Sequence, residues 1–136
     1  LSHLSGGRLG WAVTAATDPS ALEMRARRLE ELDHLLQASL VERFRYAERL
    51  SRDREGAQQT LDLWTGWWRD VMVLATGAQG PLTNLDLRDR IRGLARSLGV
   101  TRAAALVRAT RRAADLVRRN ANLRLTLEVL IAFDLP

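Results

Sequence analysis

The sequence contains no cysteine and no lysine, and it has only two histidines, His3 and His34. The absence of cysteine excludes a disulfide framework and thiolate chemistry. Because neither histidine has ligand partners at a suitable spacing, a zinc site is not expected. The sequence also lacks a G-x-S-x-G nucleophile motif, and its acidic residues are scattered singly among arginines, as is typical of helix surfaces. We therefore expect neither catalytic residues nor metal ligands in this chain.

Long hydrophobic runs and cofactor motifs are missing as well. The longest uncharged stretch, Val71–Leu85, is interrupted by glycine and proline and is too short to span a bilayer. The glycines Gly6, Gly7 and Gly10 match neither phosphate-binding nor dinucleotide-binding spacing, so no cofactor is expected. No signal peptide is recognisable, and we expect a cytoplasmic protein without a membrane partner. The chain begins at Leu1 rather than Met, which indicates a fragment of a longer protein.

What the sequence does contain is helical periodicity along its whole length. Apolar residues make up 46% of the 136 residues, which is typical of a globular domain. They recur at three- and four-residue steps and nowhere alternate with period two, so we predict an all-α fold, a bundle of about six to seven helices. The expected helices cover residues 9–16, 19–37, 40–51, 55–76, 85–98, 102–119 and 123–133.

Start and stop signals support these boundaries. Asp18 before Pro19 is typical of a helix start, and Ser39 with Glu42 forms a capping-box pattern. Gly99 should end the helix over 85–98, and Asn120–Asn122 should separate the last two helices. The faces expected to be buried in the first two capped helices are Leu22, Ala26, Leu29, Leu32, Leu35 and Leu36, and then Leu40, Phe44, Ala47 and Leu50.

The stretch Leu61–Ala75 holds three of the four tryptophans and should anchor the core. Leu61, Trp64, Trp68 and Val71 form one stripe at helical spacing, and Trp67 widens it. A tryptophan cluster can also serve as a stacking platform for bases. Because these residues lie within an apolar helical run, we interpret them as core.

Positive charge is concentrated in Thr101–Arg124. This segment has seven arginines against Asp115 alone, a net charge of +6, so the rest of the chain carries −1 of the total +5. We expect Asp115 to pair with Arg111 and Arg119 along the helix, and we expect the segment to be a solvated or subunit-facing surface rather than a base-reading element. The candidate partner-interface residues are Arg108, Arg111, Arg112, Arg119, Asn120, Asn122 and Arg124.

Several pieces of the chain together resemble a known family. In order and approximate spacing, the chain resembles the C-terminal part of the delta-prime subunit of the bacterial DNA polymerase III clamp loader. The pieces that carry the resemblance are Leu4–Ala12, Glu42–Phe44, Ala47–Leu50, Trp68–Asp70 and Asn120–Glu128, of which the last is the most specific.

The resemblance implies a domain organisation and a set of partners. Residues 1–17 would be the end of the helical lid of an AAA+ module, and residues 18–136 would be the helical collar through which five subunits form a ring. The partners would be other clamp-loader subunits, of the gamma/tau and delta types, with DNA and the sliding clamp reached only through the assembled complex. Subunits of the delta-prime type do not hydrolyse ATP, and any catalytic parts of the complex would lie outside this chain.

One departure from the family pattern bears on the choice of subunit. Relatives that hydrolyse ATP place a sensor arginine one or two residues before the small residue that matches Ala12, and here those positions are Gly10 and Trp11. Arg8 is only a displaced sensor-like candidate for nucleotide binding. This favours the delta-prime type. The collar of the gamma/tau subunit remains an alternative, and so does a free-standing, arginine-rich helical module that binds nucleic acid.

Overall fold

The computed structural model describes residues 18–77 and 88–136. Several predicted features lie outside these ranges: the expected lid-like segment 1–17, with its predicted helix over 9–16, its glycines and Arg8, and the first residues of the predicted helix over 85–98. Within them the fold is all-α, as predicted, and no strand occurs. The helices are α2 (Pro19–Leu35), α3 (Leu40–Leu50), α4 (Arg54–Ala75), α5 (Arg88–Arg118) and α6 (Leu123–Glu128), followed by the π-helical segment η2 (Val129–Asp134).

The described residues therefore contain five α-helices and one π-helical segment, slightly fewer than the six to seven helices expected for the whole chain. Apart from the end of the last α-helix, the predicted boundaries hold to within about two residues wherever the structure describes them. The expected final helix over 123–133 is α-helical only to Glu128 and then widens into η2, where the Leu135 N–H donates to the Leu130 carbonyl five residues earlier.

Helix starts follow the capping chemistry that the sequence indicates. The Asp18 carboxylate accepts a hydrogen bond from the Ser20 N–H at 3.0 Å. At the start of α3 the capping box is complete: Ser39 Oγ accepts from the Glu42 N–H, and the Glu42 carboxylate accepts from the Ser39 N–H. These hydrogen bonds pair amide groups that would otherwise have no partner at a helix end.

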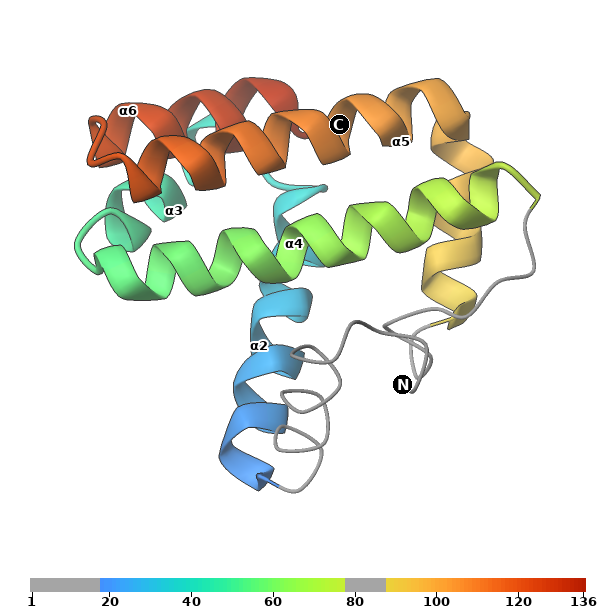
Figure 1. Cartoon of the computed structure of the whole chain (residues 1–136), viewed down its shortest axis with the longest axis horizontal. Coiled ribbons are helices and arrows are strands. Elements are labelled where there is room, and N and C mark those ends of the chain that lie inside the picture. The colour runs from blue at the N-terminus through green and yellow to red at the C-terminus, as the bar shows by residue number, and fades with distance from the viewer. Residues whose placement is uncertain (1–17, 78–87) are drawn as a thin grey trace.

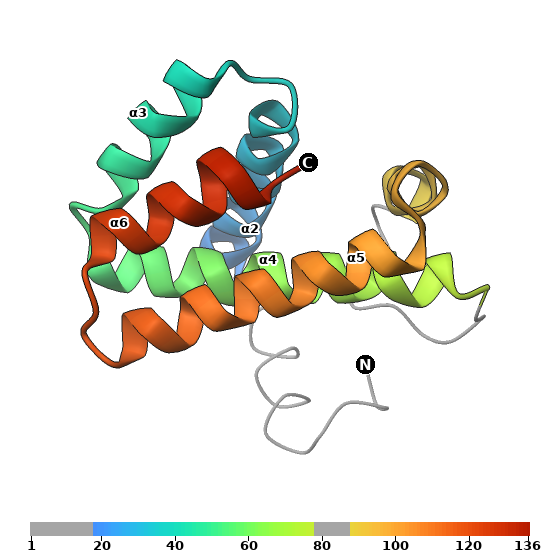
Figure 2. The same cartoon turned by 90° about the horizontal axis from the view of Figure 1, so that it is seen from above.

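The tryptophan helix α4 forms the centre of the bundle. Leu61, Trp64, Trp68 and Val71 are fully buried, and Trp67 is 2% exposed, so the interpretation of this stripe as core is confirmed. The second half of α5 packs along α4, and Figures 1 and 2 show the two helices side by side. In the view of Figure 1, α6 lies behind α5. The ring of Tyr46 on α3 stacks on Trp64 with centroids 6.2 Å apart, so α3 also packs against this core.

Helix α5 consists of two parts that meet at Gly99. The φ angle of Gly99 is 78° and its ψ angle is 169°, a conformation available essentially only to glycine. Figure 2 shows the first part of α5 turned steeply away from the second. The predicted stop at Gly99 is therefore present as a sharp bend. In the second part, the residues that recur at three- and four-residue steps are all buried, namely Leu106, Val107, Thr110, Ala113, Ala114 and Val117.

Two of the expected buried faces need correction. Leu22 and Ala26 on α2 are exposed, because the N-terminal half of that helix extends away from α4 (Figure 1). On α3, Leu40 is 51% exposed and Phe44 is half-buried, whereas Arg43 and Tyr46 are buried with Ala47. The buried face of α3 is therefore rotated relative to the apolar pattern.

Candidate interaction surfaces

In the described ranges, no group of three or more His, Cys, Asp or Glu side chains could hold a metal ion. His34 is largely exposed, and its Nε2 lies 4.0 Å from a carboxylate oxygen of Glu42. His3 lies outside the described ranges. The described helices also include none that is long and apolar enough to cross a membrane.

A cleft of about 420 Å³ lies between α2 and α3. In it the Tyr46 hydroxyl donates to Glu31 Oε1 at 2.9 Å, and the Arg49 guanidinium lies 5.7 Å from the centre of the Tyr46 ring. Burial raises the pKa of the Tyr46 hydroxyl, and the neighbouring charge of Glu31 raises it further. Three arginines and three glutamates line the cleft with His34. Because these charges balance, the cleft has no net attraction for a ligand of one sign.

The arginine-rich part of α5 presents an exposed cationic surface. Arg108, Arg111, Arg112 and Arg119, here called the arginine face, are all exposed. None of the four forms an ion pair with any carboxylate in the described parts of the chain. These four candidate residues therefore remain available for an external anion.

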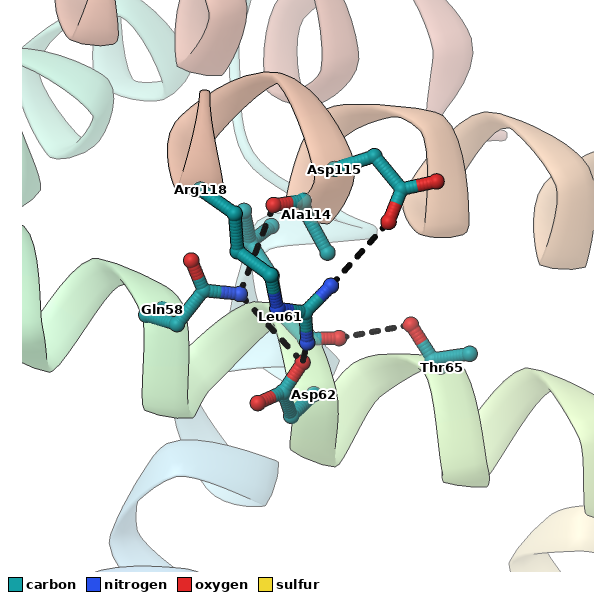
Figure 3. Close-up of polar contacts among 7 residues, drawn as sticks. All are labelled: Gln58, Leu61, Asp62, Thr65, Ala114, Asp115 and Arg118. Carbon is teal, nitrogen blue, oxygen red and sulfur yellow. Dashed lines mark hydrogen bonds and ion pairs between the residues drawn. The ribbon is translucent and has the colours of Figure 1, made fainter. Parts of the chain in front are cut away.

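The prediction that Asp115 pairs with Arg111 and Arg119 is wrong. Its carboxylate accepts from Arg118 Nη1 at 3.1 Å, not from Arg111 or Arg119. The other terminal nitrogen of Arg118 binds Asp62 on α4 at 2.8 Å, and Gln58 Nε2 lies 3.4 Å from both Asp62 and the Ala114 carbonyl. Figure 3 shows this network across the seam between α4 and α5. Asp115 is thus drawn toward the seam because Arg118 bridges two aspartates there.

The other three candidates form local contacts. Asn120 has a φ angle of 59°, so it makes the left-handed turn that ends α5. Asn122 caps α6, since its side-chain oxygen accepts from the Leu125 N–H at 2.9 Å. Arg124 Nε binds Glu128 at 3.2 Å one turn later. These contacts within the chain account for the residue types at these three positions, so no partner is needed to explain them.

A second surface, which sequence reasoning missed, is apolar. Phe133 is 65% exposed, and its ring meets that of Phe44 edge-on with centroids 5.9 Å apart. Leu40 lies one turn before Phe44, while Val129 and Leu125 lie one and two turns before Phe133, and all three are exposed. We call Leu40, Phe44, Leu125, Val129 and Phe133 the apolar face. The sequence did contain a signal for this surface, namely the four-residue spacing of Leu125, Val129 and Phe133. These three residues form a second apolar stripe next to the core positions of the same segment.

Comparisons with known proteins identify no relative. No family model matches the sequence, and neither the curated proteins nor the solved structures include a match.

Proposed function

We propose that this chain is a non-catalytic, helical oligomerisation domain, the collar of a clamp-loader subunit of the delta-prime type, which supports loading of the sliding clamp in DNA replication. The observation that carries the proposal is the apolar face. A monomeric helical protein has no need of five large apolar side chains gathered along α3, α6 and η2, whereas a subunit buries such a face against its neighbour. The resemblance of the five sequence segments to the delta-prime subunit is the reason for proposing a clamp loader as the assembly. Such an assembly would act in the cytoplasm.

Two ion pairs lie near the apolar face, one between Glu128 and Arg124 and one between Glu48 and Arg52. If a neighbouring subunit covered these groups, each of the four charges would keep its counterpart. The neighbours expected to cover the apolar face are clamp-loader subunits of the gamma/tau or delta type.

The test is assembly with purified clamp-loader subunits, measured by sedimentation. Phe133→Asp places a charge in the centre of the apolar face, and we expect it to abolish assembly without changing the helical circular dichroism. Leu116→Asp is the matched control, because Leu116 is also exposed but lies on α5. Normal assembly of Phe133→Asp, or failure of the unmodified chain to join any clamp-loader subunit, would overturn the proposal.

The expectation that this chain binds no nucleotide can be tested separately. A collar of the delta-prime type needs no nucleotide, so isothermal titration with Mg-ATP should give no heat of binding. A dissociation constant in the micromolar range would contradict this expectation. The unpaired arginine face favours the other candidate, a free-standing nucleic-acid-binding module, and sequence-specific or structure-specific binding of DNA would move that candidate to first place.

A further inference from the structure

The arginine face has the charge and shape of a phosphate-binding surface. Arg108 and Arg112 on α5, and Arg119 directly after its end, recur at steps of four and seven residues, on the side opposite the buried residues of α5. At a rise of about 1.5 Å per residue, the three span about 16 Å of helix. Arg111 flanks them. We propose that the arginine face binds the phosphate backbone of duplex DNA without reading base sequence.

The ion-pair network of Figure 3 is what leaves this surface cationic. Asp115 is the one acidic residue in the segment, and its carboxylate is held by Arg118, which also binds Asp62. Because that aspartate does not neutralise Arg111 or Arg119, four guanidinium groups face solvent together. Exposed cations of this kind gain free energy when phosphates displace their counterions and the DNA releases its own.

The lack of apolar area favours DNA over an acidic protein as the occupant. A protein partner would be expected to bury an apolar core within its contact, but most of the exposed large apolar residues in the described ranges lie on α2, α3, α6 and η2. On α5 the exposed large apolar residues are Val100 and Leu116, and only Leu116, at 37% exposure, lies between the arginines of the face in sequence. Phosphate contacts need no such core, since they fix position through charge and hydrogen bonds alone.

Base readout is not expected from this surface. Residues 101–124 contain no glutamine, which could read adenine, and no aromatic residue, which could stack on bases. The two nearby asparagines, Asn120 and Asn122, are engaged in the turn and the cap that follow α5. Binding should therefore be weak, independent of sequence and steeply dependent on salt.

The test is fluorescence anisotropy with the full chain and two duplexes of unrelated sequence, each of about 20 base pairs, at about 50 to 200 mM salt. Four phosphate contacts predict a slope of about −3.6 for the logarithm of affinity against the logarithm of salt concentration. We expect Arg108→Glu/Arg112→Glu to weaken binding at least about tenfold at low salt and to reduce the slope by about 1.8, as the loss of two contacts requires.

The control is Arg88→Glu/Arg96→Glu, which makes the same charge change at exposed positions on the first part of α5. Equal weakening by the two variants would overturn the proposal, because net charge alone would then explain binding. Undetectable binding at low salt would overturn it, and so would tighter binding to polyglutamate than to DNA, which would assign the face to an acidic protein. A clear preference for one duplex would also overturn it by indicating base readout. Since assembly is tested through Phe133, failure of either proposal is distinguishable from failure of the other.

Discussion

Replacing Arg43 with methionine should destabilise the protein more than any other change of a charged residue on α3. The guanidinium group of Arg43 is buried and donates to backbone oxygens of three segments. Nη1 lies 3.3 Å from the Ile131 oxygen and 3.2 Å from that of Leu135, while Nη2 lies 3.4 Å from the Leu36 oxygen and 2.8 Å from that of Pro136. One side chain thus satisfies carbonyl groups at the end of η2 and in the loop before α3.

The magnitude follows from the groups that the substitution would leave without a partner. Methionine keeps most of the aliphatic stem of Arg43, so the loss is mainly polar. A hydrogen bond to a charged group contributes about 1.5–3 kcal/mol, and a buried carbonyl without a partner costs about 1–3 kcal/mol. Only the contact with Pro136 is short, the contact with Leu135 is at the upper end of the usual range, and those with Ile131 and Leu36 exceed it, so the full sum is not expected. We estimate a loss of about 3 kcal/mol in the free energy of unfolding.

The measurement is urea unfolding followed by tryptophan fluorescence, because Trp64, Trp67 and Trp68 report directly on the core. With a denaturant slope of about 1.5 kcal/mol/M, a loss of this size lowers the midpoint by about 2 M. Arg45→Met is the matched control, since Arg45 is exposed on the same helix and its replacement should change stability by less than about 0.5 kcal/mol. If Arg43→Met stayed within about 1 kcal/mol of the unmodified protein, the carbonyl contacts would contribute little and the reasoning would be refuted.

Three further predictions concern the core, the bend in α5 and the capping box. Trp68→Ala should cost about 3–5 kcal/mol, and a shift of only a degree or two in the thermal midpoint would contradict the assignment of Trp68 to the core. Gly99→Ala should destabilise by about 1–3 kcal/mol because of the positive φ angle, whereas Gly93→Ala, in open space within a helix, should stabilise by about 0.5–1 kcal/mol; equal effects in thermal melts would contradict this. Hydrogen bonds from the Ser39 N–H and hydroxyl group lower the pKa of Glu42 from 4.5, so its stabilising contribution is present above that pH and is lost on acidification. Between about pH 5 and pH 3 the unmodified protein should therefore lose more stability than Glu42→Gln, and parallel losses in denaturant melts would argue against the cap.

Features set by local chemistry were predictable from the sequence. The helix start at Asp18, the capping box at Ser39, the stop at Gly99 and the tryptophan stripe of α4 each depend on residues within a turn or two of one another. Hydrophobic periodicity is reliable for helices that pack closely on both sides of their stripe, as α4 does. The same pattern misassigned Leu22 and Leu40, because periodicity indicates which residues share a face but not whether another element covers it.

Features set by distant contacts could not be found in the same way. Arg43 is buried because carbonyls about ninety positions later in the chain converge on it, and no local pattern encodes that convergence. Likewise, three- and four-residue spacing allows Asp115 to pair with any of four arginines, Arg111, Arg112, Arg118 and Arg119. Asp62 on α4 binds Arg118 and holds that arginine at the seam beside Asp115. The sequence therefore predicted a basic helix, but only the packing of α4 on α5 indicates which of its arginines remain free.

The two proposed surfaces are held in place by different contacts, and this determines how they should respond to mutation. The apolar face depends on Arg43, because the carbonyls that it binds position η2 so that Phe133 meets Phe44. The arginine face lies on a helix fixed by the buried stripe of α4 and by the bridge from Arg118 to Asp62. Loss of the Arg43 contacts should thus loosen the assembly surface first and leave binding of DNA intact in the molecules that remain folded. If that loss abolished both assembly and DNA binding in the molecules that remain folded, the two surfaces would not depend on separate sets of contacts.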